Sequence, residues 1–271
     1  MKALLGVVAM AALAVNLVTS CSSSPTGRQT VKLFPSTELA ALGAASFNDL
    51  KARQQLSDNS ADIRYLQCVS QALIGALPEP YRSASWDVQL FASDEVNAFA
   101  LPGEKIGVYS GLLEVAENQH QLAAVIGHEI GHVIAEHANE RMTAQVGAGL
   151  ALQLGGAIAY SEMDDNSAAL AMMALGLGVQ IGGVLPFSRI HESESDQLGV
   201  DYMVAAGFDP GAAADLWRNM AALGKASGPQ WLSTHPASST RIKALENYAA
   251  QLQPLYQQGR TQGKQPDCKR S

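Results

Sequence analysis

The sequence predicts an α+β fold that is mostly helical, with a small β-sheet or hairpin beside one central helix. Apolar residues recur at helical spacing along much of the chain, for example at Ile63, Leu66 and Val69. Alternation of apolar and polar residues, which is typical of strands, is found at residues 86–91. The chain has 271 residues and is 47% apolar, enough for one large domain or two small ones with a real core.

The first 20 residues are typical of an export signal rather than of a lasting membrane span, because Lys2 precedes a short apolar stretch. Segment 18–21 resembles a bacterial lipobox, in which a branched apolar residue and small residues precede a cysteine. This predicts cleavage before Cys21 and its lipidation, and Ser22 after it implies export to the outer membrane. Residues 21–30 are then expected to carry the lipid and act as a tether. A soluble secreted protein and a retained anchor helix are the alternatives.

Between the tether and the centre of the chain, helices and a few strands are expected. In order they are helices at 36–50 and 61–77, a strand at 86–91, strands at 97–101 and 106–109, a short helix at 111–116 and a long helix from 119 to about 145. Pro102 and Gly103 are a turn signal, so the second and third strands are expected to form a hairpin. Ser110 and Asn118 are the expected N-caps of the two helices that follow.

The segment from 147 to 187 is rich in Gly, Ala and Leu, and residues 166–188 carry no charge. It is long enough to span a bilayer, but an apolar hairpin or plug packed beside the central helix is favoured, because the residues after it must fold back to that helix.

Helices are then expected at 189–206 and 211–223, with a last one starting at Ser239 or Thr240. Residues 31–254 would form the folded domain and 255–271 a flexible tail, since the chain after Pro254 is rich in Gln, Gly and Lys. Cys68 and Cys268 either pair in an oxidising compartment or remain a buried residue and a free thiol.

The expected central helix contains the pattern H-E-x-x-H at residues 128–132. Residues four apart share a helix face, so His128 and His132 can bind the same metal ion. Glu129 is turned about 100° from His128, close enough to hold a water at the metal without being a ligand. Two imidazoles suit zinc, and a zinc hydrolase needs a third protein ligand and an open position for water.

The third ligand is expected to come from residues 188–196. Glu192 and Asp196 are four apart on a predicted helix, so Glu192 is assigned as the third metal ligand and Asp196 as the group that orients a ligand histidine from behind. A solvated acidic helix face is the alternative. The pattern with a third histidine six residues after the second is excluded, because Ala138 stands there. His137 is half a turn out of phase with His128 on a continuous helix and is expected at the surface.

Together these motifs resemble the zinc metallopeptidase family that includes the CAAX prenyl proteases and HtpX, and most closely its bacterial periplasmic lipoprotein branch (LoiP/BepA-like). The matching segments lie in family order at residues 97–100, 108–112, 128–132, 189–196 and 234–236, followed by Arg241. Ser195 departs from the alanine that is usual in the family, and a small residue there should not disturb the site.

The resemblance implies a zincin-type metalloprotease domain with one Zn2+ per chain and with further site residues. His235 would lie at the zinc, either as a fourth ligand that blocks water or as a donor to the tetrahedral intermediate, with Arg241 in support. The strand with Asn97, Ala98, Phe99 and Ala100 resembles the edge strand along which such enzymes bind an extended substrate.

The function expected from these residues is zinc-dependent endopeptidase activity, with Glu129 as the general base. The substrates would be unfolded or misassembled envelope proteins at the bacterial outer membrane, facing the periplasm. A net charge of -7 without a basic run excludes nucleic acid as a partner. Two other classes remain open: a chaperone-like or adaptor lipoprotein whose zinc site, closed by His235, is structural, and a zinc hydrolase of non-peptide amides.

Overall fold

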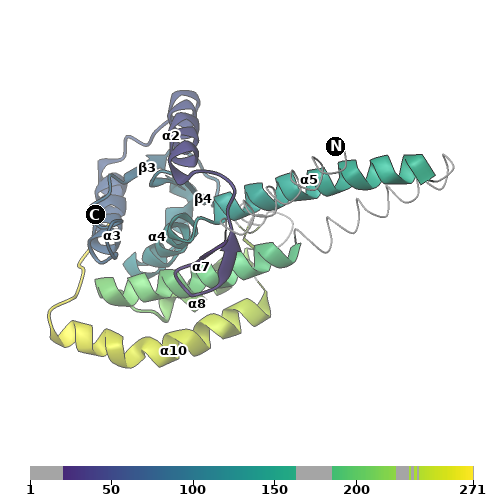
Figure 1. Cartoon of the computed structure of the whole chain (residues 1–271). Coiled ribbons are helices and arrows are strands. Elements are labelled where there is room, and N and C mark those ends of the chain that lie inside the picture. Colours follow the sequence, from purple (N-terminus) through teal and green to yellow (C-terminus); the bar gives the residue numbers. More distant parts are fainter. Residues whose placement is uncertain (1–20, 163–184, 224–231, 233–234, 237, 271) are drawn as a thin grey trace. The chain divides into compact units, whose positions relative to one another are not determined.

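The computed structural model describes residues 21–162, 185–223, 232, 235–236 and 238–270, and it has the mostly helical α+β architecture that the sequence predicts (Figure 1). The chain divides into two compact units. Met1–Ser36 and Glu136–Ile190 form the first, which we call the accessory unit, and Thr37–Ala135 and His191–Ser271 form the second, the main unit. Residues 1–20, in which the export signal is expected, lie outside the described part of the chain.

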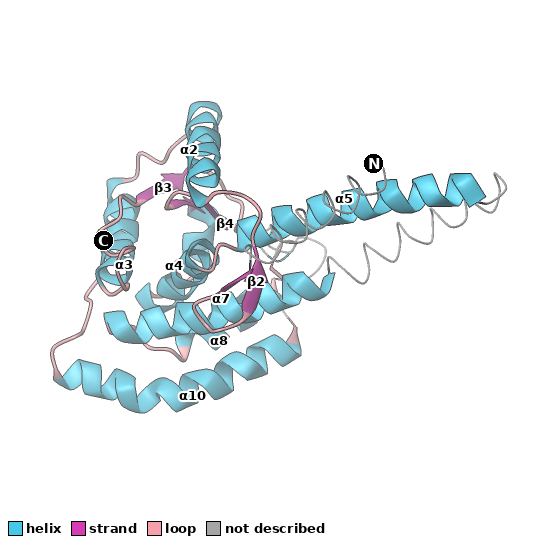
Figure 2. Cartoon of the chain, viewed as in Figure 1, coloured by secondary structure: helices cyan, strands magenta, loops and turns pink. Residues whose placement is uncertain are grey.

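Helices make up most of the described chain, with strands in two short groups (Figure 2). The helices are α2 (Ser36–Arg53), α3 (Ser60–Gly75), the 3-10 helix η1 (Ser110–Glu114), α4 (Gln119–Ile134), α5 (His137–Glu162), α7 (Leu185–Ala206), α8 (Ala212–Ala222) and α10 (Ser239–Thr261). The strands are β1 (Cys21–Ser23), β2 (Gln29–Val31), β3 (Asp87–Phe91), β4 (Ala98–Leu101) and β5 (Lys105–Tyr109).

The main unit contains a three-stranded sheet in the order β3-β5-β4. The predicted hairpin of β4 and β5 is confirmed as an antiparallel pair, and β3 pairs with β5 in parallel, so β5 is central. Alternate side chains point to opposite faces. Leu90 and Ile106 belong to the core shared with α3 and α4, whereas Phe91 and Tyr109 pack with Phe47 of α2. The sheet is therefore covered by helices on both faces.

Helix α4 runs through the core of the main unit, and every residue from Gln121 to Gly131 is buried. An apolar surface all round a helix is typical of a buried one. Helix α4 contacts α3, β4 and α8, and α10 packs on α8 (Figure 1). The inner face predicted for α8 is confirmed, because Leu216, Trp217 and Met220 are buried.

Side-chain caps fix several helix ends. The predicted cap Asn118 is confirmed, since its carboxamide oxygen accepts the backbone N–H groups of residues 120 and 121 at the start of α4. The cap predicted at Ser110 is wrong: no side chain caps η1, and the Ser110 hydroxyl binds the backbone N–H and carbonyl of Ser93. A hydroxyl that can bond a neighbouring loop competes with local capping.

The long helix predicted from 119 to about 145 is also wrong, because the chain breaks between α4 and α5. Helix α4 ends at Ile134, and Glu136 has a φ of 55° in the left-handed region, which interrupts a right-handed helix. His137 then starts α5, so its phase relative to His128 is not set by one continuous helix. His137 is buried, and the surface position predicted for it is wrong.

Residues 21–30, which are predicted to act as a tether, contain secondary structure. Strands β1 and β2 form an antiparallel hairpin in which Cys21 is opposite Val31. Within the accessory unit, Arg28 donates two hydrogen bonds to the carboxylate of Glu140, each 2.7 Å long. The hairpin is therefore attached to the first turn of α5.

Much of the apolar segment predicted at 147–187 lies outside the description, because residues 163–184 are not described. Among the described residues, no helix is both long and apolar enough to cross a membrane.

The predicted flexible tail after Pro254 is wrong in its secondary structure, because α10 continues through this proline to Thr261. Beyond the helix, Cys268 forms a disulfide with Cys68, which resolves the alternatives left open by the sequence. Arg270 binds the carboxylate of Asp62 at 2.6 Å. The C-terminal segment is thus covalently and electrostatically attached to α3.

Candidate metal centre

Helix α4 presents its two histidines side by side, as the four-residue spacing predicts. The Nε2 atoms of His128 and His132 are 3.0 Å apart, and their ring planes lie at 82°. Both side chains are buried among the apolar residues of α4 and its neighbours. Two ring nitrogens that point to the same place are suited to a shared metal ion.

Helix α7 brings Glu192 to the same place. Its Oε2 lies 3.3 Å from Nε2 of His128, and its Oε1 lies 3.3 Å from Nε2 of His132. One turn later, Oδ1 of Asp196 lies 3.0 Å from Nδ1 of His128. In the tautomer with the proton on Nδ1, this N–H donates a hydrogen bond to Asp196. Nε2 then keeps a lone pair that is directed at the site.

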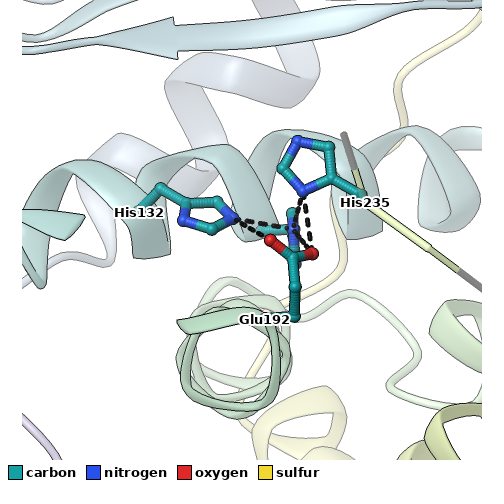
Figure 3. Close-up of side chains that lie close together, drawn as sticks. His132, Glu192 and His235 are labelled. Atoms are coloured by element: carbon teal, nitrogen blue, oxygen red, sulfur yellow. Dashed lines mark hydrogen bonds and ion pairs between the residues drawn. The ribbon is translucent and has the colours of Figure 1, made fainter. Parts of the chain in front are cut away.

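His235 joins this group from a segment 43 residues after Glu192 (Figure 3). Its Nδ1 is 2.8 Å from Oε2 of Glu192 and 3.2 Å from Nε2 of His128. One ligand atom from each of four residues, His128, His132, Glu192 and His235, lies within 4.8 Å of the others. Three imidazoles and a carboxylate are a donor set that fits a divalent transition metal, so these residues could hold such an ion.

Glu129 is on the same helix as the two histidines but lies outside this group of four. Its side chain is 3% exposed, and its Oε1 is 3.5 Å from Nε2 of His235. Nδ1 of His235 therefore faces the ligand group and its Nε2 faces Glu129. Glu129, which the sequence predicts as the general base, is not one of the four residues that could hold the metal ion.

Arg241, in the first turn of α10, contacts the carboxylates of both Asp196 and Glu192. Its Nε and Nη2 donate to Asp196 at 2.5 and 2.7 Å, and its Nη1 lies 2.9 Å from Oε2 of Glu192. Its Nη1 also donates to the carbonyl oxygen of Pro236 at 3.4 Å, next to His235. A planar guanidinium suits such paired contacts, so Arg241 connects the two carboxylates and the segment with His235.

The charges of the site are strongly coupled. Burial disfavours the charged form of His128, but hydrogen bonds with Asp196 and Glu192 outweigh it and raise the pKa of His128 to about 9. Burial also opposes the charge of Glu192, but the hydrogen bonds from His128, His132 and His235 keep the pKa of Glu192 well below its usual range. Burial also disfavours the charged form of Asp196, but the charge and hydrogen bonds of Arg241 outweigh it and lower the pKa of Asp196. A metal ion that binds here would displace a proton from His128.

Helices α4 and α7 come close enough to form the site because small residues face one another. A Cβ atom on Gly199 would lie 2.8 Å from the backbone nitrogen of His128, and one on Gly131 would lie 3.0 Å from the carbonyl oxygen of Ser195. Gly127 faces Gly199 in the same way. We did not predict this packing from the sequence; its signal is the four-residue spacing of small residues on both helices.

The strand predicted to bind substrate is β4, at the edge of the sheet. Ala98 is buried and Phe99 packs with Phe91 and Tyr109, while the carbonyl of Asn97 accepts the backbone N–H of Tyr109. Within the described part of the chain, no strand pairs with the other edge of β4. Peptide binding there would use the backbone of β4, since the Phe99 ring is held in the aromatic cluster.

An α+β fold built round a buried H-E-x-x-H helix, with a glutamate from a later helix beside both histidines, defines a zincin-type metallopeptidase. The comparisons with known proteins agree: residues 60–249 match the model of peptidase family M48, and the chain belongs to this family.

Curated relatives include two mitochondrial metalloendopeptidases named OMA1. The one from Arabidopsis thaliana is 29% identical over 77% of this chain and 41% of its own length, and the one from Schizosaccharomyces pombe is 35% identical over 62% and 48%. The beta-barrel assembly-enhancing protease of Escherichia coli is 31% identical over 61% of this chain and 35% of its own length. The chain thus spans less than half the length of each of these relatives. The predicted class of enzyme, a metalloendopeptidase, is confirmed.

Proposed function

We propose that this protein is a zinc endopeptidase that degrades or processes unfolded or misassembled proteins at the bacterial outer membrane, facing the periplasm. The observation that carries the proposal is the convergence of His128, His132 and Glu192, with Glu129 on the same helix as the histidines and 3.5 Å from His235. The donor set of two imidazoles and a carboxylate is one that catalytic zinc sites use.

In this proposal, His128, His132 and Glu192 hold one Zn2+ ion. Zinc, when bound, acts as a Lewis acid that polarises the scissile carbonyl group and lowers the pKa of a water molecule. Glu129 accepts the proton of the attacking water and then delivers it to the leaving amine nitrogen. Asp196 keeps His128 in the tautomer whose Nε2 faces the ion, and its 3.0 Å distance to Nδ1 supports this role.

The substrate would lie as an extended chain along the outer edge of β4, at residues 97–100. An unpaired strand edge offers backbone N–H and C=O groups that pair with any sequence. Backbone recognition suits an enzyme that acts on many unfolded chains, because the side chains of Ala98 and Phe99 face inward and not the substrate.

The location is supported by the sequence and by one group of relatives. The Escherichia coli relative is a beta-barrel assembly-enhancing protease of a bacterium, whereas the OMA1 relatives are mitochondrial. The lipobox that ends at Cys21 favours the bacterial envelope, with a lipid anchor on Cys21 as the partner in the outer membrane. The hairpin of β1 and β2 would then lie at the membrane surface, next to its lipid.

A second candidate function is favoured by the position of His235. Since its Nδ1 lies 2.8 Å from Glu192 and 3.2 Å from His128, it could be a fourth ligand and close the site. A closed site is typical of structural zinc, as in an adaptor or a chaperone-like lipoprotein, or of a protease that is latent until the histidine moves.

Casein degradation by purified wild-type protein, Glu129→Gln and His235→Ala tests both functions. We expect Glu129→Gln to keep zinc and to lose casein turnover by about 100-fold or more, because only the general base is removed. A Glu129→Gln variant with full turnover would refute the proposed mechanism. For His235→Ala, higher turnover indicates a latent protease and lower turnover a role in catalysis. No turnover in any of the proteins favours the adaptor.

A further inference from the structure

Trp217 of α8 packs against Arg241, next to the metal centre. The guanidinium carbon Cζ of Arg241 is 3.7 Å from the centre of the Trp217 ring system, and both side chains are buried. The nitrogens Nε, Nη1 and Nη2 are directed at the carboxylates of Asp196 and Glu192. With its edges used in this way, the guanidinium can meet an apolar neighbour only through a face, and the face of an indole attracts a cation more strongly than that of any other side chain.

A buried tryptophan is usually no more than part of a core. Two features set Trp217 apart from that role. Its ring is also 6.1 Å from the ring of His128 in an edge-on arrangement, so it lies next to a metal ligand as well as next to Arg241. In addition, the guanidinium of Arg241, which Trp217 covers, contacts the carboxylate of Glu192. It also donates to the carbonyl of Pro236, next to His235.

From this geometry we infer that Trp217 is a positioning residue for the metal centre, acting through Arg241. Its ring fixes the plane of the guanidinium, and this plane fixes Glu192, Asp196 and the Pro236 carbonyl at the same time. Without an aromatic face beneath it, Arg241 would tilt and could not keep its contacts with both carboxylates. The inference rests on the proposed metal site, and it extends the role of α8 from packing to holding the ligands.

Zinc binding to the purified full-length protein tests this role, measured by competition with a chromophoric chelator. Trp217→Met fills the space with a flexible apolar chain but has no aromatic face, and we expect zinc affinity to fall by about 10-fold, as it does when groups behind a ligand are lost. Trp217→Phe keeps an aromatic face, and its zinc affinity should be closer to that of the wild type. Casein turnover should fall in Trp217→Met through kcat, with KM nearly unchanged.

Leu216→Ala is the matched control, because Leu216 is on the same helix and is buried in the core, and its aliphatic side chain can neither bind a metal nor present an aromatic face to Arg241. It should lower the melting temperature and leave the zinc affinity of the folded protein unchanged. If Trp217→Met also keeps wild-type zinc affinity, or if Trp217→Phe loses as much as Trp217→Met, the inference is refuted. If the wild type itself binds no zinc, the proposed function fails instead, so the two failures can be distinguished.

A double-mutant cycle with Arg241→Lys covers the case in which Trp217→Met does not fold. Lysine keeps the charge but has no plane for a ring to hold. The cycle uses Trp217→Leu, which also lacks an aromatic face. In the Arg241→Lys background, Trp217→Leu should change zinc affinity by less than about twofold, because the interaction that Trp217 acts through is already lost. Equally large losses on Trp217→Leu in both backgrounds would show that Trp217 acts independently of Arg241 and would overturn the inference.

Discussion

Replacing Gly199 with alanine tests whether the close approach of α4 and α7 is what assembles the metal centre. The added Cβ would lie 2.8 Å from the backbone nitrogen of His128 and 2.9 Å from the carbonyl carbon of Gly127, whereas ordinary contacts begin at 3.4 Å. The difference of 3.4 − 2.8 = 0.6 Å must be absorbed by backbone on both helices. Metal sites tolerate errors of about 0.2 Å in ligand distance, so the displacement is about three times too large.

We therefore expect Gly199→Ala to weaken zinc binding by at least about 10-fold and casein turnover by about 100-fold, because small displacements of catalytic groups have large effects on rate. The free energy of unfolding should fall by about 1–3 kcal/mol, as is usual for an overpacked core. Zinc competition, casein turnover and urea unfolding measure the three effects. Gly131→Ala, with its closest contact at 3.0 Å, should show a smaller loss.

Gly75→Ala is the control for the chemistry of the substitution. Gly75 is the last residue of α3, and no atom lies within 4 Å of an added Cβ. This variant should keep wild-type zinc affinity and turnover and be stabilised by up to about 1 kcal/mol, since alanine is the better helix former. Wild-type zinc affinity and turnover in Gly199→Ala would refute the reasoning about the contact between α4 and α7.

Three further predictions concern the stability of the protein. Cys268→Ser removes the bond to Cys68, which closes a loop of 200 residues, and should cost about 2–5 kcal/mol in urea unfolding; a reductant should destabilise the wild type but not the variant. Burial lowers the pKa of His120, whose Nδ1 accepts the backbone N–H of Asp209, so the unfolded chain binds protons more readily and stability should be lost as the pH falls below about 6.5. His120→Asn should reduce this loss of stability at low pH. If the urea midpoint of the variant depends on pH as that of the wild type does, His120 is not its cause. Removal of metal with EDTA should lower the melting temperature, because an ion at 100 times its dissociation constant stabilises the fold by about 2.7 kcal/mol; an unchanged melting temperature would show that no metal is bound.

Features that depend on neighbouring residues could be predicted from the sequence. The spacing of His128 and His132 determines that their side chains share a face of any helix that contains them. Asn118 can cap α4 because its side chain reaches backbone N–H groups only two and three residues away. The alternation at 86–91 predicted the first strand of the sheet for the same reason, since it depends only on residues that follow one another in the chain.

Features that depend on distant segments could not be predicted in this way. The break at Glu136 separates two stretches that are each helical, and the composition on either side does not show it. Proline at 254 predicted an end to the last helix, because it removes a backbone hydrogen bond, yet α10 continues through it to Thr261. The pairing of Cys68 with Cys268 likewise required the path of the chain between them.

The sequence by itself determined the chemistry of this protein: two histidines and a glutamate on one helix, a second glutamate on another, and hence a metallopeptidase. Only the tertiary structure decided how these residues meet. Gly127 and Gly199 let the two helices approach, and Trp217 lies beneath the arginine that holds the second glutamate. The physical reason is that a ligand's identity is encoded at its own position, whereas its distance from the next ligand depends on the packing of side chains far apart in the sequence.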